Sequence, residues 1–230
     1  NTTNKVALAP LAVSLGDPAG VGPELICEAW ARREEERLRP FFVCGGSKLL
    51  SQAADRRELV VRIERVANAA EAIAAFGWAI PVLGDLNATY LPGEPNPEGA
   101  RLALTSLESA TALAATGVAS GVVTGPIAKA LLAEIGFAFP GQTEFVAEAC
   151  SVAAENAVMM LAGPNLRTVP LTVHIALADV PRSVTHDLIM RRSRIVAASL
   201  RADFGIETPH LAIAALNPHS GENGRMGREE

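Results

Sequence analysis

Short runs of apolar residues alternate along the chain with longer segments in which apolar positions recur every three to four residues. Runs of the first kind are typical of buried strands, and segments of the second kind are typical of amphipathic helices. Strand-like runs lie at residues 6–14, 41–44, 119–124, 157–161, 168–174 and 211–216, with a further apolar segment at 59–63. Helix-like segments lie at residues 22–37, 47–54, 67–76, 96–116, 126–135, 143 onward and 185–204.

This alternation predicts an α/β fold, built from βαβ units around a largely parallel sheet. Two helix boundaries are well marked. Asn96, followed by Pro97 and Glu98, has the features of an N-cap with proline in the first turn of the helix at 96–116. Gly205 is expected to end the helix at 185–204. Residues 86–99 contain three prolines and two glycines, so this segment is the best candidate for a linker.

The composition is that of a folded globular protein, with 49% hydrophobic and 20% charged residues among 230. A net charge of −5 without a basic run argues against nucleic-acid binding, and an anionic ligand would need a local positive site. No apolar run is long enough to span a bilayer, and residues 1–5 precede no signal-peptide core. The three cysteines form no C-x-x-C pair, so we expect a reducing, cytoplasmic location.

Candidate chemistry gathers in loops that follow the predicted strands, where α/β sheets bind their ligands. The first loop, residues 15–22, has glycines in the G-x-x-x-G-x-G spacing of short-chain dehydrogenases. Pro18 and Pro23 remove amide donors that a phosphate cradle needs, and the Tyr-x-x-x-Lys motif of that family is missing. Two interpretations remain: a tight strand-to-helix turn, or a loop that directs Asp17 into a cleft.

Two further loops open helices. Lys129 lies in the first helical turn after Gly125 and Pro126, where its ammonium can meet a phosphate or can simply be solvated. Gln142 and Thr143 open the next helix, where they can cap it or can hold a polar substrate over its N-terminus. Neither segment decides between its alternatives.

Two of the four histidines follow predicted strands, namely His174 and His219, and a divalent metal can draw two such side chains together. Zinc generally needs at least three protein ligands, so the two alone make an incomplete site, and ordinary hydrogen bonding is the competing interpretation. His186 and His210 lie at the start of a helix and of a strand, and we expect them to be structural.

Six segments, in this order, resemble the 4-hydroxythreonine-4-phosphate dehydrogenase family of pyridoxal phosphate biosynthesis. They are spread across nearly the whole chain. They lie at residues 16–24 (GDPAGVGPE), 124–129 (TGPIAK), 140–145 (PGQTEF), 159–161 (MML), 172–174 (TVH) and 216–222 (LNPHSGE).

The resemblance implies a fold like that of isocitrate and isopropylmalate dehydrogenases, with two subdomains flanking a cleft, and not a Rossmann fold. It places the first subdomain at residues 1–140 and the second at residues 141–230. The sequence stops at residues 227–230 in a charged, glycine-containing stretch that no helix or strand closes. We therefore expect a fragment whose second subdomain lacks its C-terminal part.

The resemblance also implies a homodimer with a shared active site, NAD or NADP as cofactor, and a divalent ion (zinc, magnesium or cobalt) held by three histidines. His174 and His219 match two of these histidines, and the third is expected beyond residue 230. The family has histidine followed by threonine at the substrate-binding helix start. Here Gln142 replaces the histidine while Thr143 is kept, and glutamine cannot carry a proton or a positive charge.

The reaction that the resemblance implies is oxidation of the secondary alcohol of 4-phosphooxy-L-threonine to the 2-amino-3-oxo acid. Decarboxylation to 3-amino-2-oxopropyl phosphate follows. Lys129 and Thr143 are candidates for the phosphate end of the substrate. Asp17, also a candidate catalytic residue, and Glu222 are candidates for orienting the histidine ligands.

Three alternatives stay open. Close relatives of the family oxidise four-carbon sugar-acid phosphates such as threonate or erythronate 4-phosphate. A phosphate acyltransferase of similar fold would need neither NAD nor the paired histidine loops, so chelation would not inactivate it. A non-catalytic module that binds a phosphorylated ligand would bind the hydroxy acid without reducing NAD.

Overall fold

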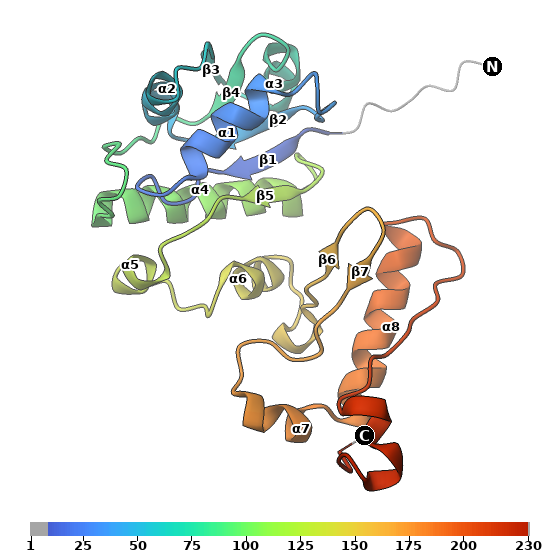
Figure 1. Cartoon of the computed structure of the whole chain (residues 1–230). Coiled ribbons are helices and arrows are strands. Elements are labelled where there is room, and N and C mark those ends of the chain that lie inside the picture. The colour runs from blue at the N-terminus through green and yellow to red at the C-terminus, as the bar shows by residue number, and fades with distance from the viewer. Residues whose placement is uncertain (1–8, 230) are drawn as a thin grey trace, which may run out of the picture. The chain divides into compact units, whose positions relative to one another are not determined.

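The computed structural model of the protein describes residues 9–229 (Figure 1). The chain divides into two compact units, Asn1–Cys150 and Ser151–Glu230, which are described separately below. Of the predicted strand at residues 6–14, positions 6–8 lie outside the described residues. The subdomain boundary at residues 140 and 141 stays a prediction.

The first unit is built on a five-stranded parallel sheet, which confirms the predicted α/β class. The strand order is β3-β4-β2-β1-β5, and every neighbouring pair is parallel. The strands are β1 (Leu11–Ser14), β2 (Phe41–Cys44), β3 (Ile63–Val66), β4 (Ile80–Leu83) and β5 (Val122–Thr124). Ser14 pairs with both Cys44 and Thr124, so the carboxyl ends of β1, β2 and β5 lie at one edge of the sheet.

Helices cover both faces of this sheet, because successive strand residues point to opposite faces and both kinds are apolar here. Val13 and Val43 pack with α1 and α2, whereas Ala12 and Phe42 pack with α3 and α4. The helices of this unit are α1 (Gly22–Ala31), α2 (Ser47–Arg56), α3 (Ala69–Ala75), α4 (Pro97–Ala115), α5 (Lys129–Glu134) and α6 (Gln142–Ala149). The predicted cap of α4 is confirmed, since the Asn96 side chain accepts a hydrogen bond from the Gly99 amide at 2.8 Å.

Several elements of this unit differ from the predictions: β3 lies at Ile63–Val66 and not at 59–63, and β5 and α5 are shorter than the segments predicted at 119–124 and 126–135. The helix predicted to reach residue 37 ends at Ala31, and turns follow it. Strand β4 was not predicted, because it is short and Pro81 interrupts it. The structure accommodates this proline because β4 pairs with β2 only from Val82 onward, so the ladder needs no amide hydrogen at Pro81.

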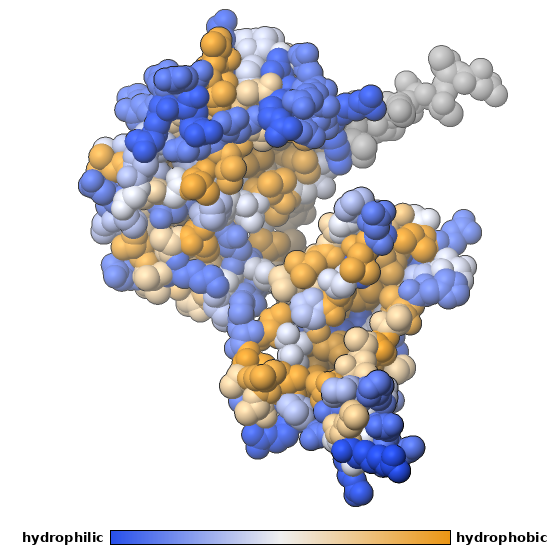
Figure 2. All heavy atoms as spheres, in the orientation of Figure 1, coloured by the Kyte–Doolittle hydropathy of each residue, from blue (hydrophilic) through white to orange (hydrophobic). Residues whose placement is uncertain are grey.

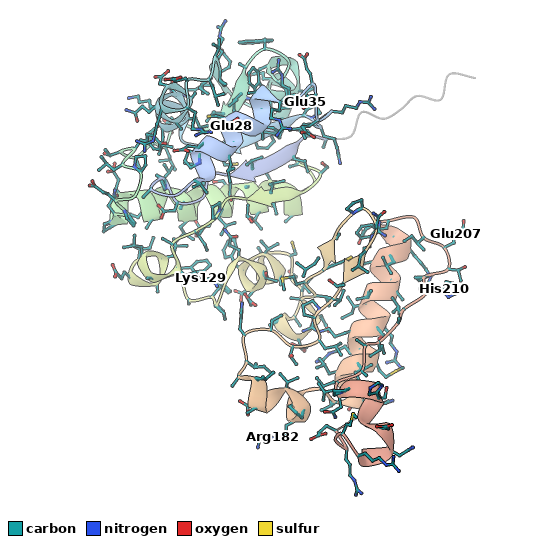
Figure 3. All side chains as sticks on the ribbon, in the orientation of Figure 1. Glu28, Glu35, Lys129, Arg182, Glu207 and His210 are labelled. Atoms are coloured by element: carbon teal, nitrogen blue, oxygen red, sulfur yellow. The ribbon has the colours of Figure 1, made fainter. Side chains whose placement is uncertain are left out.

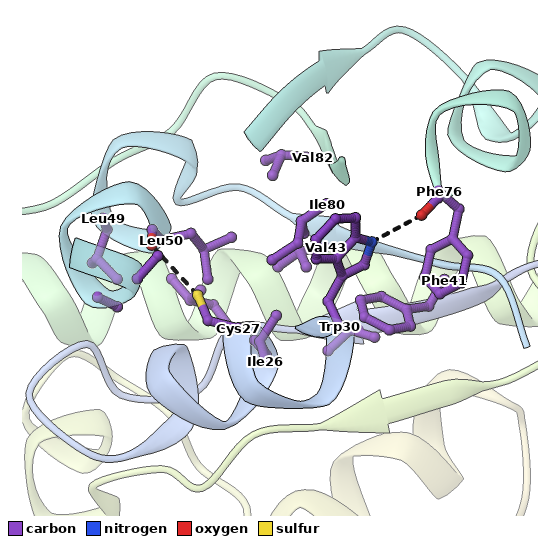
Figure 4. Close-up of a cluster of buried hydrophobic side chains, with 14 of the residues drawn as sticks. Ile26, Cys27, Trp30, Phe41, Val43, Leu49, Leu50, Phe76, Ile80 and Val82 are labelled. Atoms are coloured by element: carbon purple, nitrogen blue, oxygen red, sulfur yellow. Dashed lines mark hydrogen bonds between the residues drawn. The ribbon is translucent and has the colours of Figure 1, made fainter. Parts of the chain in front are cut away.

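The core between α1, α2 and the sheet buries two polar groups that are both hydrogen-bonded (Figure 4). The indole nitrogen of Trp30 donates to the Phe76 carbonyl at 2.9 Å, and the Cys27 thiol donates to the Leu50 carbonyl at 3.4 Å. Burial raises the pKa of Cys27 to about 12, so this thiol stays protonated and unreactive at neutral pH.

The second unit has little sheet. Leu161–Ala162 (β6) and Arg167–Thr168 (β7) form a short antiparallel pair. The remaining elements are the 3-10 helices η1 (Ala154–Asn156) and η2 (Leu177–Asp179), the helices α7 (Val180–Ser183) and α8 (His186–Ala202), and η3 (Pro218–Gly224), a run of turns whose residues 219–223 have left-handed backbone. Helix α8 confirms the prediction at 185–204, and its cap is the Thr185 hydroxyl, which accepts from the Leu188 amide at 3.2 Å.

The strands predicted at 157–161, 168–174 and 211–216 are wrong except for the few residues of β6 and β7. A strand needs a neighbour for its amides and carbonyls, and within residues 151–229 no third strand pairs with β6 or β7. Apolar side chains therefore stay exposed, as Figure 2 shows over the visible face of this unit. Leu161 and Ile213 are each 60% exposed. Across the described part of the chain, no helix is long and apolar enough to cross a membrane.

We predict that Trp30→Phe lowers the free energy of unfolding by about 2 kcal/mol, because it leaves the buried Phe76 carbonyl without its donor and opens a small cavity. Trp78→Phe is the matched control, since Trp78 is 48% exposed and stacks only on Arg62. Urea unfolding measures both variants. Equal midpoints for the two variants would contradict the role given to the Trp30 hydrogen bond.

Candidate functional site

Three loops singled out in the sequence meet at the carboxyl edge of the sheet. The loop after β1 lies against the turn after β5, where the Asp17 amide donates to the Pro126 carbonyl at 2.7 Å. Gly16 has a φ of +74°, and a Cβ there would lie 2.6 Å from the Pro126 carbonyl oxygen. Only glycine fits this position, because the backbone is left-handed and the neighbouring backbone leaves no room.

The turn after β5 also leaves no room for a side chain where it meets the loop after β1. A Cβ at Gly125 would lie 2.8 Å from the Leu15 carbonyl oxygen, and the Gly125 amide donates to the Ser14 carbonyl at 3.2 Å. Within the loop, the amide of Ala19 donates to the Asp17 carboxylate at 2.9 Å and the amide of Gly20 to the Asp17 carbonyl at 3.0 Å. The amides of Asp17, Ala19 and Gly20 are used within the protein, so these three are not free to hold a phosphate.

Ser106 of α4 anchors the junction between the loop after β1 and the turn after β5, and the sequence did not single it out. Its hydroxyl accepts from the Leu15 amide at 2.8 Å and donates to the Cys44 carbonyl at 2.6 Å. The side chain is 2% exposed, so it ties the ends of β1 and β2 to α4 inside the core. A serine on the apolar face of a predicted helix was the signal that could have indicated it.

Gln142 joins the start of α6 to the same turn. Its side-chain nitrogen donates to the Gly125 carbonyl at 2.9 Å. A carbonyl can only accept, so the orientation of the amide is fixed and the Gln142 oxygen Oε1 is left as an acceptor. The capping alternative is wrong for both Gln142 and Thr143. The N-cap of α6 is Gly141, no side chain caps the helix, and Thr143 is exposed.

Lys129, the first residue of α5, lies beside the start of α6 (Figure 3). Its ammonium nitrogen is 3.6 Å from the position that a Cβ on Gly141 would take, and the Glu144 carboxylate is 3.2 Å from the same point. A positive and a negative side chain therefore share the space beside Gly141. Lys129 and Gln142, which are far from Asp17 in the sequence, are thus connected through the Gly125–Pro126 turn to the loop that holds Asp17.

The two candidate metal ligands lie in the second unit, on exposed turns with left-handed backbone. His174 has a φ of 57° and His219 a φ of 52°, and Glu222 follows in the same left-handed run with a φ of 43°. Among residues 9–229, no group of three His, Cys, Asp or Glu side chains is arranged to hold a metal ion. The predicted pair of ligands stays a prediction, since its third member was expected beyond residue 230.

The other two histidines are exposed. His186 is the first residue of α8, where its Nδ1 atom lies 3.6 Å from the Asp187 carboxylate. His210 lies in the segment after α8 and not at the start of a strand, which corrects the element predicted there.

We predict that Gly16→Ala lowers the free energy of unfolding by about 2–4 kcal/mol, because the new Cβ meets the Pro126 carbonyl in a left-handed conformation. Gly77→Ala is the control, because nothing lies within 4 Å of a Cβ at that position. Denaturant unfolding compares the two variants. The tight junction would be contradicted if Gly16→Ala were as stable as Gly77→Ala.

Comparison with known proteins places these features in one family. The sequence profile described as "Pyridoxal phosphate biosynthetic protein PdxA" matches residues 36–230. A 4-hydroxythreonine-4-phosphate dehydrogenase of Erythrobacter litoralis is 56% identical over 96% of this chain and 66% of its own length. One of Zymomonas mobilis is 47% identical over 96% of this chain and 65% of its own length. The chain thus spans just under two thirds of these curated relatives.

Solved structures agree with the sequence matches. The 4-hydroxythreonine-4-phosphate dehydrogenase of Klebsiella pneumoniae superposes with a TM-score of 0.84 at 30% identity, covering 96% of this chain and 68% of that protein. The one from Burkholderia phymatum gives a TM-score of 0.82 at 30% identity, covering 96% and 66%. The fold, the six segments and these matches together show that the chain belongs to the PdxA family of pyridoxal phosphate biosynthetic proteins.

Proposed function

We propose that this chain belongs to an enzyme that oxidises the secondary alcohol of 4-phosphooxy-L-threonine, with NAD or NADP as oxidant and a divalent ion as assistant. The resulting 2-amino-3-oxo acid loses carbon dioxide to give 3-amino-2-oxopropyl phosphate, an intermediate for pyridoxal 5'-phosphate. The observation that carries this proposal is the meeting of Lys129, Gln142 and the Asp17 loop around the Gly125–Pro126 turn. The relatives named 4-hydroxythreonine-4-phosphate dehydrogenase, at 56% and 47% identity, supply the reaction.

The proposed architecture is that of isocitrate and isopropylmalate dehydrogenases, with subdomains 1–140 and 141–230 flanking a cleft. We further propose a homodimer in which the two copies share their active sites. The occupied amides of the Asp17 loop support a fold that does not bind a dinucleotide through this glycine loop.

Lys129 is proposed to bind the phosphate end of the substrate together with Thr143. The chain carries a net charge of −5, so a dianionic phosphate needs a local cation, and Lys129 supplies one beside the start of α6. The exposed hydroxyl of Thr143 can donate to a phosphate oxygen. Asp17 holds its own loop through the Ala19 amide, and we propose that it orients the site and does not transfer a proton.

Gln142 is proposed to contact the polar part of the substrate through its Oε1 atom. Its nitrogen already donates to Gly125, so this atom accepts from a substrate hydroxyl or ammonium and cannot donate to a carboxylate or phosphate. A dehydrogenase of threonate or erythronate 4-phosphate is the second candidate, because those substrates offer a hydroxyl donor where 4-phosphooxy-L-threonine has its ammonium donor, and Oε1 can accept from either.

His174 and His219 would hold the divalent ion, with zinc, cobalt or magnesium as candidates. Both imidazoles are exposed and so are free to bind a metal, and imidazole nitrogen is a donor that these ions accept, but the set needs a third ligand. When bound, the ion would lower the pKa of the substrate hydroxyl and stabilise the alkoxide as the nicotinamide accepts the hydride. Glu222, three residues after His219, is proposed to orient that ring.

We expect His174→Ala and His219→Ala each to lower bound zinc or cobalt at least tenfold, because each removes one of few nitrogen ligands. Metal content after equilibrium dialysis, measured by mass spectrometry, reports the loss, and His210→Ala is the exposed control (Figure 3). Unchanged metal content in both variants would remove the assignment. Turnover that survives chelation would favour the acyltransferase alternative.

We expect Gln142→His to change the ratio of kcat/KM between 4-phosphooxy-L-threonine and threonate 4-phosphate by about tenfold, or about 1.4 kcal/mol, because the new ring can donate and carry charge. Gln52→His on the exposed face of α2 is the matched control. Where turnover is too slow, calorimetric affinities for the two ligands give the same ratio. Identical ratios in the parent chain and in Gln142→His would show that position 142 sets no preference.

A further inference from the structure

Helix α8 lines a pocket of about 660 Å³ within the second unit, which we call the α8 pocket. The helix contributes three successive turns to one wall, and the segment around η1 forms the other. The residues that line the pocket include Asn156, His186, Asp187, Met190, Arg191 and Arg194. This volume is in the range of pockets that hold small-molecule ligands.

The α8 pocket is lined by two arginines and one carboxylate, Asp187, so its lining carries an excess of positive charge. Arg191 and Arg194 are three positions apart, so both lie on the pocket face of the helix. Among the residues that the structure describes, no carboxylate oxygen lies within 4.0 Å of the guanidinium groups of Arg191, Arg192 or Arg194. Two arginines that form no ion pair within the described part of the chain, in a protein of net charge −5, favour an anionic ligand.

Arg192 adds to this positive field from behind the pocket. Its guanidinium donates to the Ala157 carbonyl, which ties the segment after η1 to α8, and its Nε atom is buried without a partner in the described structure. Burial lowers the pKa of Arg192, and the neighbouring charge of Arg191 lowers it further. The arginines therefore repel one another, and a bound anion would relieve this repulsion.

Asp187 limits where an anion can sit. Its carboxylate lines the pocket near the start of α8 and lies 3.6 Å from the Nδ1 atom of His186. At a rise of about 1.5 Å per residue, Asp187 is about 6 Å along the helix from Arg191 and about 10 Å from Arg194. The negative part of a ligand is therefore expected between Arg191 and Arg194, on the side away from Asp187.

The same pocket offers apolar surface. Met190 is 37% exposed and Val152 is 40% exposed, and Ile195 lines the wall next to Arg194. An inorganic ion would leave these side chains in water, whereas an aromatic or apolar group would cover them. We propose that the α8 pocket binds a phosphomonoester that carries an aromatic or apolar body, with the phosphate held by Arg191 and Arg194. This proposal goes beyond the proposed oxidation, because it concerns binding and needs no turnover.

The test uses adenosine 5'-monophosphate as a probe for the 230-residue chain, with calorimetry and backbone NMR as readouts. We expect binding that shifts amide signals of α8, and we expect the double variant Arg191→Gln/Arg194→Gln to weaken it at least tenfold. Arg201→Gln, on the same helix, is the control. The Arg201 guanidinium donates to the carbonyls of Ala197 and Glu207 and does not line the pocket. The Arg201→Gln variant should therefore bind the probe with the affinity of the parent chain.

Two further arms fix the chemistry. Adenosine, which lacks the phosphate, should bind at least tenfold more weakly, and inorganic phosphate should compete with the probe. Asp187→Asn should tighten binding of the probe about threefold, because it removes a carboxylate whose negative charge repels the phosphate. Binding that is unchanged in Arg191→Gln/Arg194→Gln, or no detectable binding of the probe at millimolar concentration, would overturn the proposal. Neither outcome depends on whether the chain oxidises any substrate.

Discussion

The close approach of two backbone segments, the loop after β1 and the turn after β5, is the constraint on which the candidate site depends. Gly16 and Gly125 allow this approach, since a Cβ at either would lie within 2.8 Å of a carbonyl oxygen. Ser106 holds the end of β1 from inside the core. Gln142 then adds the start of α6 to the same turn, so one junction fixes four segments that are distant in sequence.

Sequence patterns predicted the structure correctly where it is decided by residues that are close together in the chain. Asn96 caps its helix as predicted, and the helix predicted to begin at Thr185 does begin there, because a capping side chain needs only its own first turn. The parallel sheet followed from alternating apolar runs, and the loops at its carboxyl edge followed from the sheet. Strand β4 was missed because Pro81 breaks its pattern, and only the pairing with β2 explains why it is tolerated.

The site itself was predictable in part. The sequence singled out Gln142 and Lys129 but left open whether each was structural; for Gln142 the deciding contact is a hydrogen bond to a carbonyl in another loop. Ser106 was missed: its place on the apolar face of a predicted helix was a signal, but its partners, the Leu15 amide and the Cys44 carbonyl, lie far along the chain. In the second unit, apolar segments such as 211–216 look like strands in sequence. Strand formation depends on a neighbour, and the described residues of that unit supply none.

We propose that the junction around Gly125 and Pro126 forms the substrate site of this family member. A backbone NMR titration of the chain with 4-phosphooxy-L-threonine tests this proposal. We expect the largest shifts to fall on Gly125, Lys129, Gln142 and Thr143. Saturable binding whose shifts spare all four residues would contradict it.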